Sequence, residues 1–176
     1  MKKLLISIFL ILLTASYVFA KSYPRWQNMP IKVFVSETNP KTPLMKKAFS
    51  EWENKSHGMV MFQYVTADEI NNADIIVTYV KQGPQSGDAV RIGETKCSYN
   101  SNGYFNKVRI EITDQKQTDE KFSEGETYKI MLHEIGHSIG LLEHSENFKS
   151  IMWPTNRSQA EGISQEEILR LKNIYY

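Results

Sequence analysis

The sequence contains a single cysteine, Cys97, among its 176 residues, so the chain cannot form an internal disulfide bond. It also lacks a basic cluster, because its lysines and arginines are dispersed and the formal net charge is only +1. This distribution gives no indication of a nucleic-acid partner. After the first twenty residues, no apolar run is long enough to span a bilayer. The stability of the chain must therefore come from an apolar core or a bound metal, and its length suffices for one domain.

Residues 1–20 have the composition of a signal peptide. Two lysines follow the initiating methionine, residues 4–13 are almost entirely apolar, and Ala20 is the small residue that signal peptidases require. The alternative is a retained membrane anchor, but about ten strongly apolar residues fall short of the ~20 that a span needs. We therefore predict cleavage after Ala20. The remaining domain, residues 21–176, is then secreted or periplasmic and has no stable membrane association.

Three segments rich in apolar and β-branched or aromatic residues predict strands, at residues 31–35, 59–65 and 73–80. Two more strands are predicted at residues 94–99 and 107–113, joined by the turn-rich residues 100–103. Between the first two, Thr42 followed by Pro43 predicts the N-cap and first turn of a helix. Its apolar residues are expected to form one buried stripe, consisting of Leu44, Ala48, Phe49 and Trp52.

Two further helices are predicted near the end of the chain. The first begins with a capping box of Ser123 and Glu126 and is stopped by Gly140. The second begins with a capping box of Ser164 and Glu167. The order of strands and helices predicts a single domain of mixed α/β (α+β) class, with a sheet covered by a long helix.

The most informative segment begins at His133 and reads HEIGHSIGLLEH. On a helix, His133 and His137 lie one turn apart on the same face, where two imidazoles can hold one zinc ion. Glu134 lies about 100° around the helix from His133, so its carboxylate can reach a water on the metal as a general base. Gly140 lets the chain reverse towards a third ligand. The segment holds three of the four histidines, and the fourth, His57, is expected to be an ordinary surface residue.

This segment resembles the H-E-x-x-H-x-x-G-x-x-H motif of metzincin metalloproteases, and of the matrixins in particular. Met152, within residues 150–154, is similar to the methionine of the matrixin turn that lies beneath the metal, and residues 163–168 resemble the start of the last matrixin helix. The resemblance implies a metzincin-like zincin fold, with a twisted, mixed five-stranded sheet and three helices that include an active-site helix and a C-terminal helix. It also implies one catalytic Zn²⁺ and hydrolysis of internal peptide bonds.

The third metal ligand has two interpretations. The matrixin motif places its third histidine at position 143, where this chain has Glu143, and His144 comes one residue later. Either Glu143 is the ligand, or the loop contains a one-residue insertion and His144 is the ligand. Met152 lies eight residues after His144, which is the matrixin spacing, and this spacing favours His144.

The matrixin pattern is incomplete in other respects. No loop rich in histidine and aspartate, of the kind that holds structural zinc and calcium in animal matrixins, is present, so the sequence gives no basis for structural Ca²⁺. Residues 23–26 resemble the start of a catalytic domain, so no propeptide is expected. Cys97 lies on a predicted strand and is interpreted as a free, partly buried thiol.

Other functions remain open at this point. One is another H-E-x-x-H hydrolase, such as a deformylase, although Cys97 lacks the Gly-Cys-Leu-Ser setting of that family. Another is a non-catalytic binding module stabilised by zinc, which would not need Glu134. For the protease we expect a monomer with a protein or peptide substrate. The substrate would lie extended against residues 94–99, and residues 154–162 would line its main side-chain pocket.

Overall fold

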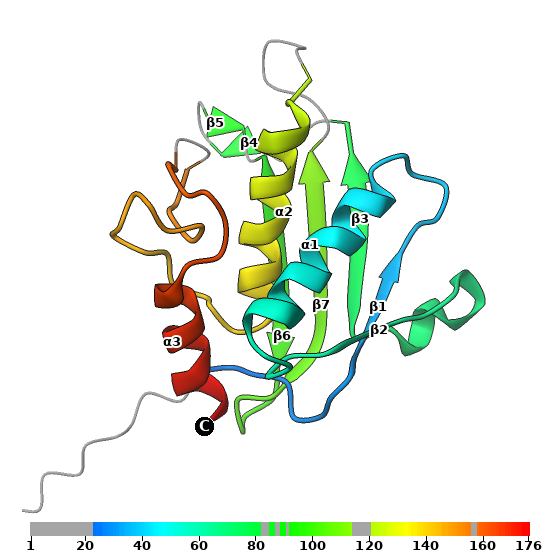
Figure 1. Ribbon diagram of the computed structural model, residues 1–176. Helices are drawn as coiled ribbons and strands as arrows, with labels where there is room; N and C mark the ends of the chain where they lie inside the picture. Colours follow the sequence, from blue (N-terminus) through cyan, green and yellow to red (C-terminus); the bar gives the residue numbers. More distant parts are fainter. Residues whose placement is uncertain (1–22, 82–84, 87–88, 91, 114–120, 156–157) are drawn as a thin grey trace, which may run out of the picture.

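In the computed structural model, two helices cover one face of a sheet (Figure 1). The structure describes residues 23–81, 85–86, 89–90, 92–113, 121–155 and 158–176. The predicted signal peptide, residues 1–20, lies outside this range. Within the described ranges, every helix is too short or too polar to cross a bilayer.

The sheet has five strands, as predicted. Their spatial order is β2 (Phe62–Tyr64), β1 (Ile31–Val35), β3 (Ile75–Val80), β7 (Phe105–Thr113) and β6 (Gly93–Tyr99). The first four run parallel, whereas β6 is antiparallel to β7 and forms one edge of the sheet. A separate two-stranded ribbon consists of β4 (Gln85–Ser86) and β5 (Ala89–Val90). The mixed five-stranded sheet is therefore confirmed, and the segment proposed to receive the substrate lies at its edge.

Of the five predicted strands only β1 has the predicted bounds, and β3 and β6 differ from the prediction at their first residues by two residues and one residue. Strand β2 has three residues where seven were expected, because only Phe62–Tyr64 pair with β1. Strand β7 starts earlier than expected, because its first residue, Phe105, still pairs with Tyr99 of β6. A short 3₁₀ helix, η1 (Ala67–Asn72), was not predicted.

Helix α1 (Thr42–Lys55) lies across the sheet beside α2 (Glu124–Ser138). The prediction that Thr42 is its N-cap is wrong, since the N-cap is Lys41 and the Thr42 hydroxyl donates to the Ser36 carbonyl instead. The apolar stripe is confirmed except at Leu44, which is only partly buried. The buried residues of this helix are Thr42, Met45, Ala48, Phe49 and Trp52.

The N-termini of α2 and α3 (Gln165–Tyr175) have the predicted caps. Ser123 N–H donates to the Glu126 carboxylate at 2.8 Å, and the Ser123 hydroxyl accepts from Glu126 N–H at 3.2 Å. Ser164 N–H likewise donates to the Glu167 carboxylate at 2.7 Å. Both capping boxes satisfy N–H groups that have no partner within the helix.

The C-terminal half of α2 is fixed by side chains from three distant segments. Trp52 Nε1 donates to the Leu132 carbonyl at 2.9 Å, and Trp26 Nε1 donates to the Ser138 carbonyl at 2.9 Å. The Tyr175 hydroxyl donates to the Ile139 carbonyl at 3.1 Å. The last carbonyls of a helix have no partner within it, so the donors from Trp26 and Tyr175 define where α2 ends, while Trp52 attaches an earlier turn of the helix. The histidines lie on this half of the helix.

Candidate metal centre

Three imidazoles converge at the C-terminal end of α2. His133 and His137 lie one helical turn apart, with ring centroids 4.6 Å from each other. The ring of His144 lies 5.2 Å from that of His133 and 5.0 Å from that of His137. One ring nitrogen of each residue falls within 4.8 Å of the others. Two nitrogens bound to one tetrahedral zinc ion lie about 3.4 Å apart, so small side-chain shifts would fit the three residues to a zinc ion.

Backbone carbonyls orient the first two imidazoles. His133 Nδ1 lies 2.8 Å from the Ile151 carbonyl oxygen, and His137 Nδ1 lies 2.8 Å from that of Leu141. A carbonyl oxygen can only accept, so both Nδ1 atoms carry hydrogen and both Nε2 atoms keep a free lone pair. Such second contacts fix the tautomer and direction of metal-binding histidines. The donor set therefore suits zinc.

The reversal after α2 depends on Gly140. Its φ of +113° is a conformation that favours glycine, and a Cβ atom there would lie 2.7 Å from the Pro24 carbonyl oxygen. Leu141 N–H then donates to the Gly136 carbonyl at 3.0 Å, which closes the last turn. This turn directs the following residues back across the histidine face of α2.

The structure brings His144, and not Glu143, to the histidine pair. Glu143 is exposed and lies outside the histidine group. Its backbone carbonyl accepts a hydrogen bond from Arg170 of α3, which holds the additional loop residue in place. The interpretation with a one-residue insertion before His144 therefore agrees with the geometry.

Met152 lies fully buried against Gly136 of α2, the residue before His137. The turn that carries it is held by hydrogen bonds from two sides. Ser145 N–H donates to the Met152 carbonyl at 2.9 Å, and the Ser150 hydroxyl donates to the carboxylate of Glu167, which is wholly buried. The predicted methionine turn is thus bonded to Ser145, the residue after His144, and to α3.

Replacing Gly136 by alanine should destabilise the domain. The new Cβ atom would lie 2.4 Å from Met152 Sδ and 3.1 Å from the Trp52 ring, and neither buried side chain can move away freely. Overpacking of this kind costs about 1–3 kcal/mol, which outweighs the gain in helix propensity. The free energy of unfolding, from urea denaturation of the metal-free protein, measures the effect.

The matched control is Gly125→Ala in the same helix. A Cβ atom at Gly125 meets nothing within 4 Å. This substitution should therefore raise the free energy of unfolding by about 0.5–1 kcal/mol, the usual gain for glycine to alanine in a helix. Equal effects of the two substitutions would show that contact with Met152 does not matter.

Burial keeps the imidazoles neutral. Removal from water lowers the pKa of His133 to about 4, and the neighbouring His144 adds to this effect. Burial likewise lowers the pKa of His137 to about 3, with a further contribution from His133. The pKa of His144 is lowered by burial and by the Arg170 guanidinium group. Neutral imidazole is the form that binds a metal ion.

Acidification should therefore weaken the metal-free fold. Below the ordinary pKa of 6.5, the unfolded chain binds protons at His133 and His137 that the folded chain does not bind. Above pH 6.5 both histidines are neutral in the folded and the unfolded chain, so they do not reduce stability. As the pH falls from 6.5 towards the folded pKa values of about 4 and about 3, protonation of the unfolded chain progressively lowers the free energy of unfolding. Each histidine lowers the free energy of unfolding by about 1.4 kcal/mol per pH unit.

Urea unfolding of the chelator-treated protein between about pH 7 and about pH 5 measures this slope. The comparison is a variant in which His133 and His137 are both replaced by phenylalanine, which removes the two titrating groups. Its stability should depend less steeply on pH. The same slope in both proteins would contradict the assignment.

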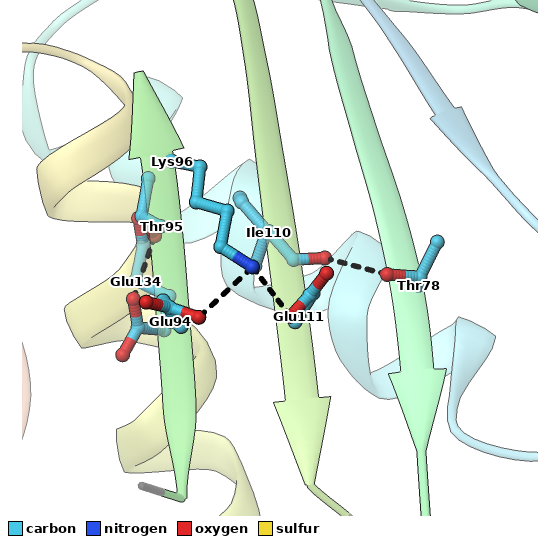
Figure 2. Close-up of polar contacts among 7 residues, drawn as sticks. All are labelled: Thr78, Glu94, Thr95, Lys96, Ile110, Glu111 and Glu134. Carbon is cyan, nitrogen blue, oxygen red and sulfur yellow. Dashed lines mark hydrogen bonds and ion pairs between the residues drawn. The ribbon is translucent and has the colours of Figure 1, made fainter. Parts of the chain in front are cut away.

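Glu134 is buried at the strand β6 side of α2, with 5% of its surface exposed. The Thr95 hydroxyl lies 2.6 Å from Glu134 Oε2, and Figure 2 shows Thr95 on the edge strand next to the glutamate. Lys96 points to the opposite face of the strand, where it pairs with Glu94 at 3.0 Å and with Glu111 at 3.2 Å. Side chains alternate between the two faces along a strand, so only every second residue of β6 faces α2.

The structure confirms the predictions for His57, as a surface residue, and for Cys97, as a free and partly buried thiol. His57 is exposed at the turn after α1 and takes no part in the histidine group. Cys97 is a free, partly buried cysteine whose Sγ lies 4.0 Å from the His137 carbonyl oxygen. Burial, with the nearby Glu134, raises the pKa of this thiol to about 12, so it is un-ionised at neutral pH.

Sequence reasoning missed Thr95 and Arg170. Thr95 contacts Glu134, and Arg170 contacts the backbone of Glu143 just before His144, in each case from a segment more than twenty residues away. Their only sequence signal was strand alternation for Thr95 and position on the last helix for Arg170. Neither signal identifies a contact partner.

Comparison with known proteins agrees with this geometry. The family model for matrixins matches residues 25–176. The chain is 25% identical to the interstitial collagenase of Equus caballus and 24% identical to that of Sus scrofa, in each case over 92% of this chain and 35% of the relative. The chain thus spans about a third of the length of these relatives.

The fold also has a solved counterpart. The archaemetzincin of Methanopyrus kandleri superposes with a TM-score of 0.52 at 12% identity, covering 89% of this chain and 98% of that one. This likeness concerns the fold alone. The matrixin match extends over most of the chain, including all three histidines and Met152. The chain therefore belongs to the matrixin family and forms a metzincin-like zinc metalloprotease domain.

Proposed function

We propose that this domain is a zinc-dependent endopeptidase in which His133, His137 and His144 hold one catalytic zinc ion and Glu134 is the general base. The observation that supports this most directly is that one ring nitrogen from each of three histidines lies within 4.8 Å of the others, and that the helix carrying two of them also carries the buried carboxylate of Glu134. Three protein ligands leave one tetrahedral position open, as a catalytic zinc site requires. A site built only for stability would usually be closed by a fourth ligand.

Each residue of the centre has a separate task. When bound, zinc supplies a Lewis acid that acidifies water and polarises the scissile carbonyl group. Glu134 accepts the proton of the attacking water and donates it to the nitrogen of the leaving amine. The carbonyls of Ile151 and Leu141 keep the Nε2 atoms of two histidines aimed at the metal. Met152 packs against Gly136 of the helix that carries two of the histidines.

We propose that the substrate is a protein or peptide that binds in an extended conformation along strand β6. That strand is an edge of the five-stranded sheet, so one side of its backbone can pair with a further strand. Residues 154–162 would line the side-chain pocket, although residues 156–157 lie outside the described range. The names of the relatives concern interstitial collagen, and because the chain spans 35% of their length we carry over no preference for that substrate.

The functional unit that we propose is residues 21–176, acting as a monomer after export and cleavage of residues 1–20. The family match begins at residue 25, close to the proposed cleavage site. The signal-peptide pattern is the basis for placing the enzyme in the periplasm or outside the cell.

The alternative is a zinc-stabilised binding module with the same fold. Digestion of an unfolded protein by the zinc-loaded domain, with sequencing of all new peptide termini, separates the possibilities. Cuts at many internal positions are expected for a general endopeptidase, and one or two cuts would indicate a dedicated enzyme. Release of terminal residues alone would refute the endopeptidase. The absence of any cut by protein that holds zinc would favour the binding module.

A further inference from the structure

Strand β6 contacts the side chain of Glu134 as well as forming the edge of the sheet. Two of its residues, Gly93 and Thr95, face α2 at this point. If Glu134 is the general base, as proposed above, the orientation of its carboxylate matters for catalysis, and these two residues of β6 determine it.

The Thr95 hydroxyl lies close to two acceptors of the same residue. Its oxygen is 2.6 Å from Glu134 Oε2 and 3.0 Å from the Glu134 carbonyl oxygen. A hydroxyl has one proton to donate, and bonds to an ionised carboxylate are shorter and stronger than bonds to a neutral carbonyl. The proton is therefore donated to Oε2. One carboxylate oxygen of Glu134, Oε2, is therefore hydrogen-bonded to β6.

The other carboxylate oxygen of Glu134, Oε1, lies directly against the backbone of Gly93. A Cβ atom at this position would lie 2.5 Å from Glu134 Oε1 and 2.8 Å from Glu134 Cγ. Any side chain at residue 93 would therefore push the glutamate away. The glutamate can lie flat against β6 only because the strand has no side chain there, and Thr95 fixes its rotation.

We propose that Thr95 is a positioning residue, which orients the carboxylate of Glu134 from the strand that also aligns the substrate. One rigid element then sets the direction of the proton acceptor and the position of the scissile bond. Misplacement of a catalytic group by about 1 Å can cost a hundredfold in rate. Loss of the Thr95 hydroxyl should accordingly affect the chemical step and leave substrate binding unchanged.

The test compares Thr95→Val, which keeps the shape and removes the hydroxyl, with Thr95→Ser, which keeps the hydroxyl. Cleavage of an internally quenched peptide gives kcat and KM separately, and zinc content is measured for each protein. Thr95→Val should lower kcat by about 10- to 100-fold with KM and zinc content unchanged. Thr95→Ser should recover most of the wild-type kcat.

A matched control is Thr78→Val on β3. The Thr78 hydroxyl bonds only weakly to the Ile110 carbonyl at 3.4 Å, away from Glu134 (Figure 2). This variant should keep the wild-type kcat. In a Glu134→Gln background, Thr95→Val should cause no further loss, because the residue it positions is already disabled.

Several outcomes would overturn the inference. An unchanged kcat in Thr95→Val, equal losses in the serine and valine variants, or a loss that appears only in KM would each contradict it. If wild type cuts the peptide, these results leave the proposed function intact and remove the role of Thr95 alone. Zinc-loaded wild type that cuts no peptide would overturn both.

Discussion

Glu134→Gln should lower kcat for peptide cleavage by about 10²- to 10⁴-fold, the range that general acid–base catalysis contributes. Glutamine has nearly the same shape as glutamate but cannot take up the proton of the attacking water. The histidines and their carbonyl partners are untouched, so zinc content should remain at one ion per chain. The measurement is kcat from peptide cleavage, together with zinc content by atomic emission on the same preparation.

Glu124→Gln is the matched control for that substitution. Glu124 is an exposed glutamate in the first turn of the same helix, far from the histidines in sequence. Its replacement removes the same charge and should leave kcat within about twofold of wild type, as surface substitutions usually have small effects. Equal cleavage by wild type and Glu134→Gln would end the assignment of Glu134 as the base.

His144→Ala should weaken zinc binding by more than about 100-fold, since loss of even an outer-shell partner of a metal ligand typically costs 10- to 100-fold. Two imidazoles on one helix remain, but they hold the metal from one side only. Competition with a chromophoric chelator gives the dissociation constant. Far-ultraviolet circular dichroism establishes that the helices are retained.

Glu143→Ala separates the two candidate ligands. Its backbone carbonyl, which accepts from Arg170, is still present in the variant, so the loop should keep its path. Zinc affinity should stay within about threefold of wild type, as expected for an exposed side chain that does not bind the metal. If Glu143→Ala releases zinc and His144→Ala does not, the third ligand is the glutamate and the register of the loop is wrong.

The parts of the fold that the sequence predicted are those that depend on neighbouring residues. Capping boxes join residues three apart, and Ser123 with Glu126 formed as expected. The spacing of His133 and His137 sets them on one helix face for the same reason. The turn-rich residues 100–103 marked the end of a predicted strand at residues 94–99, and the structure has this strand as Gly93–Tyr99.

Contacts between distant segments were not predictable from these patterns. Trp52 was predicted only as part of an apolar stripe, yet its Nε1 also donates to the Leu132 carbonyl, eighty residues further along the chain. The buried Glu167 was identified as a cap, yet it also accepts from Ser150 of the methionine turn. The sequence pattern identifies the contact of Glu167 with Ser164, three residues away. Its contact with Ser150 forms only when α3 packs against the methionine turn, so no local pattern predicts it.

The attachments of α2 and of the methionine turn have a consequence for the order in which a newly made chain acquires the centre. The carbonyl of Ile139 is bonded by Tyr175, and the hydroxyl of Ser150 is bonded by Glu167, so both contacts come from the last helix. A nascent polypeptide that has all its histidines but has not released α3 from the ribosome lacks these supports. Because α3 is made after all three histidines, the metal-binding geometry acquires its full support only once that helix has left the ribosome and packed.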